Sequence, residues 1–304
     1  MIAAGDAVAR LSAGLGDGPA ARLAASALVE ADLLGQPRFG IAMLDEWQPG
    51  GTALPPSGVD QPLVWRDCAG TFAPLAVAGA TLDLAGAARH FGIAAAFLRG
   101  VRGFGRLAPF MRHLADQGLI GMAGAEGPPF VAPQGGTRPV IGTNPLALAM
   151  GKGQARVVID IASSSATMAD IRQAQASGAT LPEGIALDAG GQPTRTAAQV
   201  AALLPRGGRI GSLLGLIVAL LAGVAGGGRG DAQGRGLFLL ALDPSRAGDD
   251  PAWLARLARL QDDWRGGGGY WPQGGGLAAD ARLDADFLHQ LNTHLARMDE
   301  RAAP

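Results

Sequence analysis

Residues 138–150 read RPVIGTNPLALAM and form the stretch that decides the fold. A β-branched run meets a Thr-Asn-Pro turn, and an apolar run follows the turn. Pro145 lacks a backbone N–H and directs Asn144 towards an extended or turn conformation. Thr143 and Asn144 therefore place a hydroxyl and an amide on a short, stiff loop, which suits a polar ligand.

The composition is that of a protein with a packed core. Hydrophobic residues make up 48% of the 304 residues and charged residues 17%, which excludes a disordered chain. The formal net charge is -1 without a long basic run, so we expect neither nucleic acid nor a membrane as a partner. Cys68 is the only cysteine, and we interpret it as a small core residue. It fits a reducing, cytoplasmic location, and the first residues lack the pattern of a signal peptide.

Helical patterns alternate with short apolar runs, which predicts an α/β fold. Two helices are expected within residues 7–34, with a break at 16–19. Further helices are expected at 76–92, 166–177, 197–204, 251–264 and 284–298. Strands are expected at 93–98, 119–122, 130–132, 139–141, 146–150, 156–161 and 236–243. Residues 47–62 are expected to form a loop, and the glycine-rich segments 226–230 and 266–276 are expected to be flexible.

Residues 210–225 read IGSLLGLIVALLAGVA, an apolar run that invites comparison with a membrane span. The run is short against the roughly 20 residues that a bilayer requires, and arginines flank both ends. We therefore predict a helix that is buried on all sides within a large core.

Three further elements follow the Thr-Asn-Pro turn in a fixed order: DIASS at 160–164, LPEG at 181–184 and GGRIG at 207–211. The series resembles the type-2 malate/L-lactate dehydrogenase family of NAD(P)-dependent oxidoreductases. The resemblance implies a three-layer α/β fold with a mixed sheet, of the L-sulfolactate dehydrogenase-like type and not a Rossmann fold. It also implies a homodimer. A helical part for dimerisation and substrate would span approximately 1–75 and 245–304, and a nucleotide-binding sheet part approximately 76–244.

The resemblance further implies NADH or NADPH as the cofactor. The resemblance places the cofactor near the segment 104–110, the Thr-Asn-Pro turn and the DIASS element, and Arg209 is a candidate for binding a nucleotide phosphate. These cofactor candidates are Phe104, Gly105, Gly142, Thr143, Asn144, Pro145, Asp160, Ala162, Ser163, Ser164 and Arg209. For the serines, an ordinary helix N-cap remains the alternative.

Several places where the family keeps its acid–base groups are altered. Family members carry Ser-His-Gly after the N-terminal helices, where this sequence has Arg38-Phe39-Gly40. Phe39 cannot transfer a proton, and the guanidinium of Arg38 does not readily lose one. A second family segment carries imidazoles where Arg102 and Gly103 stand here. The aspartate of a third family turn is replaced by Gly190.

Other polar residues are candidates for the lost chemistry. Asp45 and Glu46 form a carboxylate pair beside Trp47 that suits acid–base work, although adjacent acids in a loop are often only solvated. Arg38, Arg102 and Arg209 suit a carboxylate or a phosphate, or are surface arginines of an arginine-rich chain.

The four histidines and the metal-binding residue types carry no separate signal. His90, His113, His289 and His294 lie outside the family's proton-donor places and are interpreted as solvated or capping residues. No His/Cys cluster has metal-ligand spacing, so no protein metal site is predicted.

The first functional hypothesis is NAD(P)H-dependent reduction of a small cyclic imine or ketone that bears a carboxylate. An imine already protonated in water needs less help from a protein acid than a ketone does. Arg38, Phe39, Arg102 and Asp45 are the catalytic candidates. The alternatives are a non-redox cyclisation or elimination in a pocket shaped by Phe39, Phe104 and Trp47, and a non-catalytic binding subunit.

Overall fold

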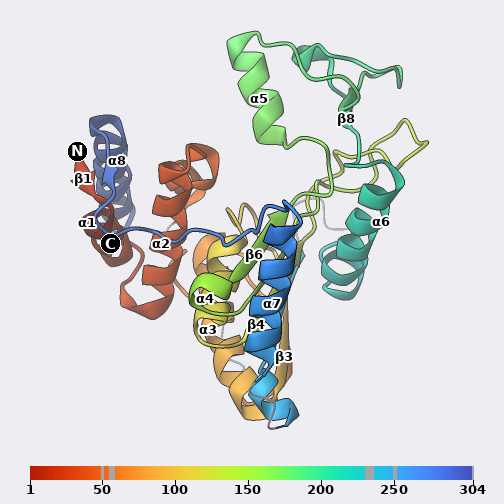
Figure 1. Ribbon diagram of the computed structural model, residues 1–304. Coiled ribbons are helices and arrows are strands. Elements are labelled where there is room, and N and C mark those ends of the chain that lie inside the picture. The colour runs from red at the N-terminus through yellow and green to blue at the C-terminus, as the bar shows by residue number, and fades with distance from the viewer. Residues whose placement is uncertain (49–50, 55–58, 230–235, 249–251, 303–304) are drawn as a thin grey trace.

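The computed structural model describes residues 1–48, 51–54, 59–229, 236–248 and 252–302 (Figure 1). Parts of the expected loop at 47–62, the end of the glycine-rich run at 226–230 and the expected helix start at 251 lie outside these residues.

A six-stranded mixed sheet is the centre of the molecule. Its strand order is β2-β3-β9-β4-β5-β6, and only the β2–β3 pair is parallel. The strands are β2 (Leu63–Asp67), β3 (Ile93–Arg99), β4 (Ile120–Ala125), β5 (Leu146–Met150), β6 (Val157–Ile161) and β9 (Leu237–Leu242). β9 reads LFLLAL and lies between β3 and β4, so its continuous apolar sequence is explained by burial on both faces.

Helices cover both faces of the sheet and give three layers. On one face lie α3 (Ala73–Phe91) and α4 (Ala108–Asp116), which pack on β3, β9, β4 and β5. On the other face lie α6 (Arg209–Val218) and the π-helical turn η5 (Ala219–Ala225) that continues it. The expected helix at 76–92 is thus confirmed as α3.

The N- and C-terminal helices form an additional layer outside α3 and α4. It contains α1 (Ala4–Gly14), α2 (Gly18–Leu33) and α8 (Ala285–Ala302), and the short strands β1 (Ile2–Ala3) and β10 (Arg282–Leu283) pair within it. α2 packs on α3 and α4, and one continuous apolar core joins this layer to the sheet. β2 belongs to the sheet, and α7 (Trp253–Gly266) packs beside β6.

A smaller group of elements lies apart from the helical layer, at the top of Figure 1. It contains α5 (Met168–Ser177) and the short strands β7 (Ala186–Leu187) and β8 (Ala202–Leu203). The helix expected at 197–204 is wrong for its second half: η4 (Ala197–Gln199) is a single 3-10 turn, and β8 follows because it pairs with β7. The remaining 3-10 turns are η1 (Pro37–Phe39), η2 (Ile41–Glu46), η3 (Gly153–Ala155) and η6 (Pro244–Ala247). The runs expected as strands at 130–132 and 139–141 meet only in an isolated bridge between Val131 and Ile141.

The helix at 210–225 is present, but the prediction that it is buried on all sides is wrong. Its small residues, such as Gly211 and Gly215, face the protein, because an ideal Cβ at Gly215 would lie 2.7 Å from Ile141 Cδ1. The large apolar residues face outward instead. Those at least 39% exposed are Ile210, Leu213, Leu216, Ile217, Leu220, Leu221 and Val224. Within the described residues, no helix is both long and apolar enough to cross a membrane.

The glycine-rich segment at 266–276, expected to be flexible, is anchored along β6. Val158 N–H donates to Pro272 O at 2.7 Å, and Trp271 Nε1 donates to Arg156 O at 3.0 Å. A side chain at Gly274 would overlap Val158, so glycine is required for this close approach. The expectation fails because composition reports the freedom of the unfolded segment and not the hydrogen bonds that hold it.

Candidate active site

One large cavity, of about 1290 Å³, lies where the sheet, the N-terminal layer and α5 meet. This volume exceeds the roughly 300–1,000 Å³ that ordinary small-molecule pockets occupy, so the cavity can hold an extended ligand together with a small one. Its wall comes from residues far apart in the sequence. The lining residues that carry the argument are Arg38, Phe39, Glu46, Thr143, Asp160 and Arg172.

The Thr-Asn-Pro turn forms part of this wall. Thr143 and Pro145 line the cavity, whereas Asn144 is fully buried beneath them. The Asn144 amide donates from Nδ2 to Gly215 O at 2.8 Å, and its Oδ1 accepts from Gly127 N–H at 3.2 Å. Asn144 also has a φ of +37°, in the left-handed region that asparagine tolerates better than most residues. The amide therefore holds the turn in place and does not face the cavity.

The two serines that follow β6 are also used by the protein itself. Ser163 and Ser164 are fully buried. Ser163 Oγ donates to Thr143 O at 2.8 Å, and Ser164 Oγ donates to Ala166 O at 2.6 Å. These bonds position the Thr-Asn-Pro turn against the segment that leads to α5. Ala162, by contrast, lines the cavity.

Asp160, at the end of β6, joins the cavity wall to the start of α4. Its Oδ2 accepts from Ala108 N–H at 2.9 Å and from Leu107 N–H at 3.1 Å. Burial raises the pKa of the Asp160 carboxyl, and these amide bonds oppose the rise. The carboxylate thus satisfies backbone donors at the N-terminus of α4. The glycine-rich segment 100–105, which precedes this helix, lines the cavity.

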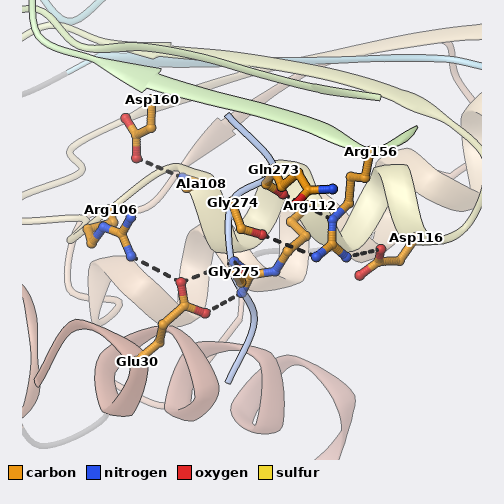
Figure 2. A network of polar contacts seen from close by, with 10 residues as sticks. All are labelled: Glu30, Arg106, Ala108, Arg112, Asp116, Arg156, Asp160, Gln273, Gly274 and Gly275. Atoms are coloured by element: carbon orange, nitrogen blue, oxygen red, sulfur yellow. Dashed lines mark hydrogen bonds and ion pairs between the residues drawn. The ribbon is translucent and has the colours of Figure 1, made fainter. Parts of the chain in front are cut away.

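A buried ion-pair network supports the same segment from below (Figure 2). Glu30 on α2 binds Arg106 at 3.0 Å and also binds Arg112 on α4. Arg112 donates in turn to Gly275 O at 2.5 Å, so the network also reaches the segment beside β6. The site-lining residues after position 100 are therefore fixed to three other parts of the chain.

The altered segment 37–46 forms another part of the lining, close to Gly103 and Gly105. Arg38 and Phe39 in η1 line the cavity, as do Arg102, Phe104 and Gly105. Asp32 on α2 anchors the segment, because its Oδ2 accepts from Ile41 N–H at 2.8 Å. Burial raises the pKa of Asp32 to about 6, against the effect of this amide bond. A side chain at Gly40 would overlap the Asp32 carboxylate, so the close approach requires glycine.

The structure separates the adjacent acids Asp45 and Glu46. Asp45 lies outside the large cavity and faces α8, where its Oδ1 lies 3.2 Å from Arg297 Nη1 and 3.8 Å from His294 Nδ1. Glu46 lines the cavity instead. Among the described residues, none makes a hydrogen bond or an ion pair with the Glu46 carboxylate.

Two cationic side chains of the lining also have no partner among the described residues. Within the described parts of the chain, neither Arg38 nor Arg172 of α5 is held by a carboxylate or a carbonyl. Of the other two acids of the lining, Glu126 is engaged by Arg229 at 2.8 Å, and Asp160 accepts from backbone amides. The cavity therefore offers guanidinium groups suited to a carboxylate or a phosphate.

The other candidates lie away from the cavity. Gly142 packs behind it, and Arg209 begins α6 outside the lining set. None of the four histidines lines the cavity, and His294 is buried against Asp45, so its interpretation as a solvated or capping residue is wrong. Burial raises the pKa of the Cys68 thiol to about 11, which fits a core residue. In the parts of the chain that the structure describes, no group of three or more His, Cys, Asp and Glu residues suits a metal ion.

Sequence reasoning missed Arg172 and did not choose Glu46. Arg172 lies one turn into α5, and its place on the cavity depends on how that group of elements folds over the sheet. Glu46 was visible only as half of an acidic pair. The sequence does not predict which of the two acids faces the cavity, because both lie at the end of a short 3-10 turn that has no regular pattern of inward and outward positions.

Comparison with known proteins places these features in a family. The family model described as malate/L-lactate dehydrogenase matches residues 11–269. A Delta(1)-pyrroline-2-carboxylate/Delta(1)-piperideine-2-carboxylate reductase of Pseudomonas putida is 35% identical over 196 residues, which cover 63% of this chain and 58% of that protein. A (2R)-3-sulfolactate dehydrogenase (NADP(+)) of Chromohalobacter salexigens is 36% identical over 177 residues, 53% of each chain. The matched regions thus span little more than half the length of these curated relatives.

The fold agrees over almost the whole chain. The sulfolactate dehydrogenase from Methanocaldococcus jannaschii superposes with a TM-score of 0.77 at 21% identity and covers 98% of both chains. The mixed-sheet α/β fold that the sequence implied is therefore confirmed. Because the family model spans most of the chain, this protein belongs to the malate/L-lactate dehydrogenase family of oxidoreductases.

Proposed function

We propose that this protein reduces a small cyclic imine that bears a carboxylate, with NADH or NADPH as the reductant. The observation that carries the proposal is the make-up of the cavity lining. Among the residues that the structure describes, it holds the unengaged guanidinium groups of Arg38 and Arg172 and the hydroxyl of Thr143, but no histidine or cysteine. Such a site suits a substrate that brings its own proton, as a protonated imine does.

The residues present fit a dinucleotide. The segment 100–105 brings backbone glycines to the cavity surface, and a nucleotide approaches glycine backbone more closely than it approaches side chains. Arg172 would bind a phosphate, and Thr143 and Pro145 would contact the flat ring system. A bound NADH or NADPH would supply the hydride. Arg38 would hold the substrate carboxylate, and Phe39 and Phe104 would exclude water from the ring.

The printed names of relatives support this assignment. The Pseudomonas putida relative is named for cyclic imine carboxylates, and the Chromohalobacter relative for NADP(+). A ketone, such as the 2-oxo acid that corresponds to malate or lactate, is the less favourable substrate. Its oxygen needs a proton donor during reduction, and the described residues of the cavity wall include no histidine.

The direct test mixes purified protein with Delta(1)-piperideine-2-carboxylate and either reduced nicotinamide, and follows oxidation of the cofactor by absorbance. Turnover with the imine and much slower turnover with pyruvate are expected. Conversion of the imine without added nicotinamide would favour a non-redox role. Binding of the nicotinamide without turnover of either substrate would favour a non-catalytic subunit.

We also infer that the protein is a homodimer that pairs through the outer face of α6 and η5. The seven large apolar side chains of this face are exposed at spacings of three and four residues, so they form one stripe. No charged residue interrupts the stripe between positions 210 and 225, and an uncharged face can pair with itself about a two-fold axis. The family resemblance supports a second copy of this chain as the occupant.

The oligomeric state tests this inference. Light scattering after size-exclusion chromatography should give a dimer for the native protein and a monomer for the double variant Leu216→Glu/Ile217→Glu. Leu260→Glu on α7 is a matched control, because Leu260 is 53% exposed but lies outside the stripe. A native monomer, or a dimer that survives the double variant, would contradict the inference.

A further inference from the structure

Among the described residues that line the cavity, Glu46 is the acid that has neither a partner within the protein nor a role in the proposed reaction. It ends η2, whose apolar residues Ile41 and Leu44 are buried in the core. The same turn is fixed at its start by the bond from Ile41 N–H to Asp32. The backbone that presents Glu46 is thus held at both ends, although the Glu46 side chain itself is exposed to the cavity.

The carboxylate of Glu46 occupies the space beside Gly103. An ideal Cβ atom at position 103 would lie 3.1 Å from Glu46 Oε2, closer than ordinary van der Waals contact. Gly103 has a φ of +61°, a conformation in which a larger residue would be strained. Glycine therefore leaves the cavity open at this point, and the carboxylate of Glu46 lies beside the opening.

The charge pattern of the lining completes the argument. Arg38 offers a cation and Glu46 an anion, and within the described residues neither group is paired with another side chain. A cyclic imine that bears a carboxylate has the complementary pattern when protonated, since it carries one negative carboxylate and one positive ring nitrogen. A ligand with a carboxylate alone would leave Glu46 facing unpaired into the site.

We propose that Glu46 is a catalytic residue whose carboxylate accepts a hydrogen bond from the protonated ring nitrogen of the substrate. This assignment rests on the proposed reductase function. The negative charge favours the protonated imine over the neutral imine, and the protonated form is the better hydride acceptor. The ring nitrogen keeps its proton while the adjacent carbon is reduced, so Glu46 transfers no proton. The product amine then takes a second proton from water.

A binding experiment tests this role independently of turnover. L-Proline carries the carboxylate and the charged ring nitrogen, whereas cyclopentanecarboxylate carries only the carboxylate. Calorimetric titration in the presence of NADP(+) should show that the native protein prefers L-proline. Glu46→Gln should reduce the affinity for L-proline by about 10- to 100-fold, the range for a lost hydrogen bond to a charged group, and leave cyclopentanecarboxylate unchanged.

Asp45→Asn is the matched variant, because it neutralises the adjacent acid that faces α8. It should retain the preference of the native protein. Turnover should show the same contrast, with kcat for the imine reduced in Glu46→Gln and not in Asp45→Asn. As the pH is raised, the rate of Glu46→Gln should begin to fall at a lower pH than that of the native protein, because the bound imine is no longer held in its protonated form. Thermal unfolding of each variant verifies that the fold is retained.

The outcomes separate the two proposals. If the native protein does not reduce the imine but Glu46→Gln loses its preference for L-proline, the proposed function fails and the charge recognition stands. If the native protein reduces the imine and Glu46→Gln keeps both the preference and the rate, the role of Glu46 is overturned.

Discussion

Two parts of the cavity wall use their polar residues in opposite ways. In the turn at 142–145 and the serines after β6, each buried polar side chain binds the protein backbone, as Asn144 and Ser163 do. In the wall made by 37–46, Arg38 and Glu46 face the cavity without a partner among the described residues. The first part maintains the shape of the site, and the second is available for a ligand. Substitutions in the first should therefore alter stability, and those in the second should alter binding.

The largest expected effect lies outside both parts, at Glu30. Glu30→Ala would leave Arg106 and Arg112 without their buried counter-ion, so we expect the free energy of unfolding to fall by about 3 to 5 kcal/mol. Urea unfolding followed by circular dichroism measures this change. Asp67→Ala is the control, because its ion pair with Arg99 is more than half exposed and is worth at most about 1 kcal/mol. Equal losses in the two variants would show that the buried network has no special weight.

A smaller loss is expected for Asn144→Ala. The variant removes two buried hydrogen bonds and places alanine in the left-handed region, so the free energy of unfolding should fall by about 2 to 4 kcal/mol. Thr143→Ala, one residue away, removes a hydroxyl that faces the cavity and should change stability by less than about 0.5 kcal/mol. If Asn144→Ala unfolds like the native protein, the turn does not depend on its amide.

Asp32→Asn should stabilise the protein, and only above a certain pH. The pKa of Asp32 is about 6 in the folded protein against an ordinary value of 3.8, so folding favours the protonated carboxyl. This contribution is complete below pH 3.8 and is lost as the pH rises through 6. A permanently neutral amide should therefore add about 1 kcal/mol at pH 8, after allowance for solvent, and nothing at acid pH. Unfolding curves of both proteins across this pH range test the sign, and a destabilised variant at pH 8 would contradict it.

The smallest effect on stability, and a clear one on binding, is expected for Arg38→Ala. The side chain is exposed, so the free energy of unfolding should stay within about 0.5 kcal/mol. The affinity of the Arg38→Ala variant for cyclopentanecarboxylate should fall by roughly tenfold, because a charge-assisted hydrogen bond to the carboxylate is lost. Arg22→Ala removes the same charge from an exposed position of α2 outside the cavity and should retain the affinity.

Much of the architecture followed from the sequence. The strand expected at 236–243 is confirmed as β9, because a short continuous apolar run bounded by glycine and aspartate is typical of a buried strand. β2 was missed because it follows a loop rich in glycine and proline and is a short strand at the border of the sheet, mostly exposed. The orientation of α6 was not predictable either. Its composition was apolar throughout, and only the packing of Gly211 and Gly215 against the protein shows which face is turned outward.

The site was less predictable than the fold. The resemblance identified segments that reach the cavity, including Thr143, Phe104 and Asp160. It did not indicate which polar groups within a segment are used internally, because that depends on distant backbone atoms such as Gly215 O. The choice between Asp45 and Glu46 depended on α8, which lies more than 200 residues further along the chain.

The segment anchored along β6 has a consequence for how the sheet meets other chains. A strand with unpaired backbone groups at a border invites pairing with a neighbouring molecule. At the β6 border such pairing is blocked, because the N–H of Val158 already donates to Pro272 O and Gly274 packs against the strand. The β2 border differs, because Leu63 and Trp65 are exposed and no other strand of the described residues pairs with its outer edge, so we expect any extension of this sheet by a second molecule to occur on that side.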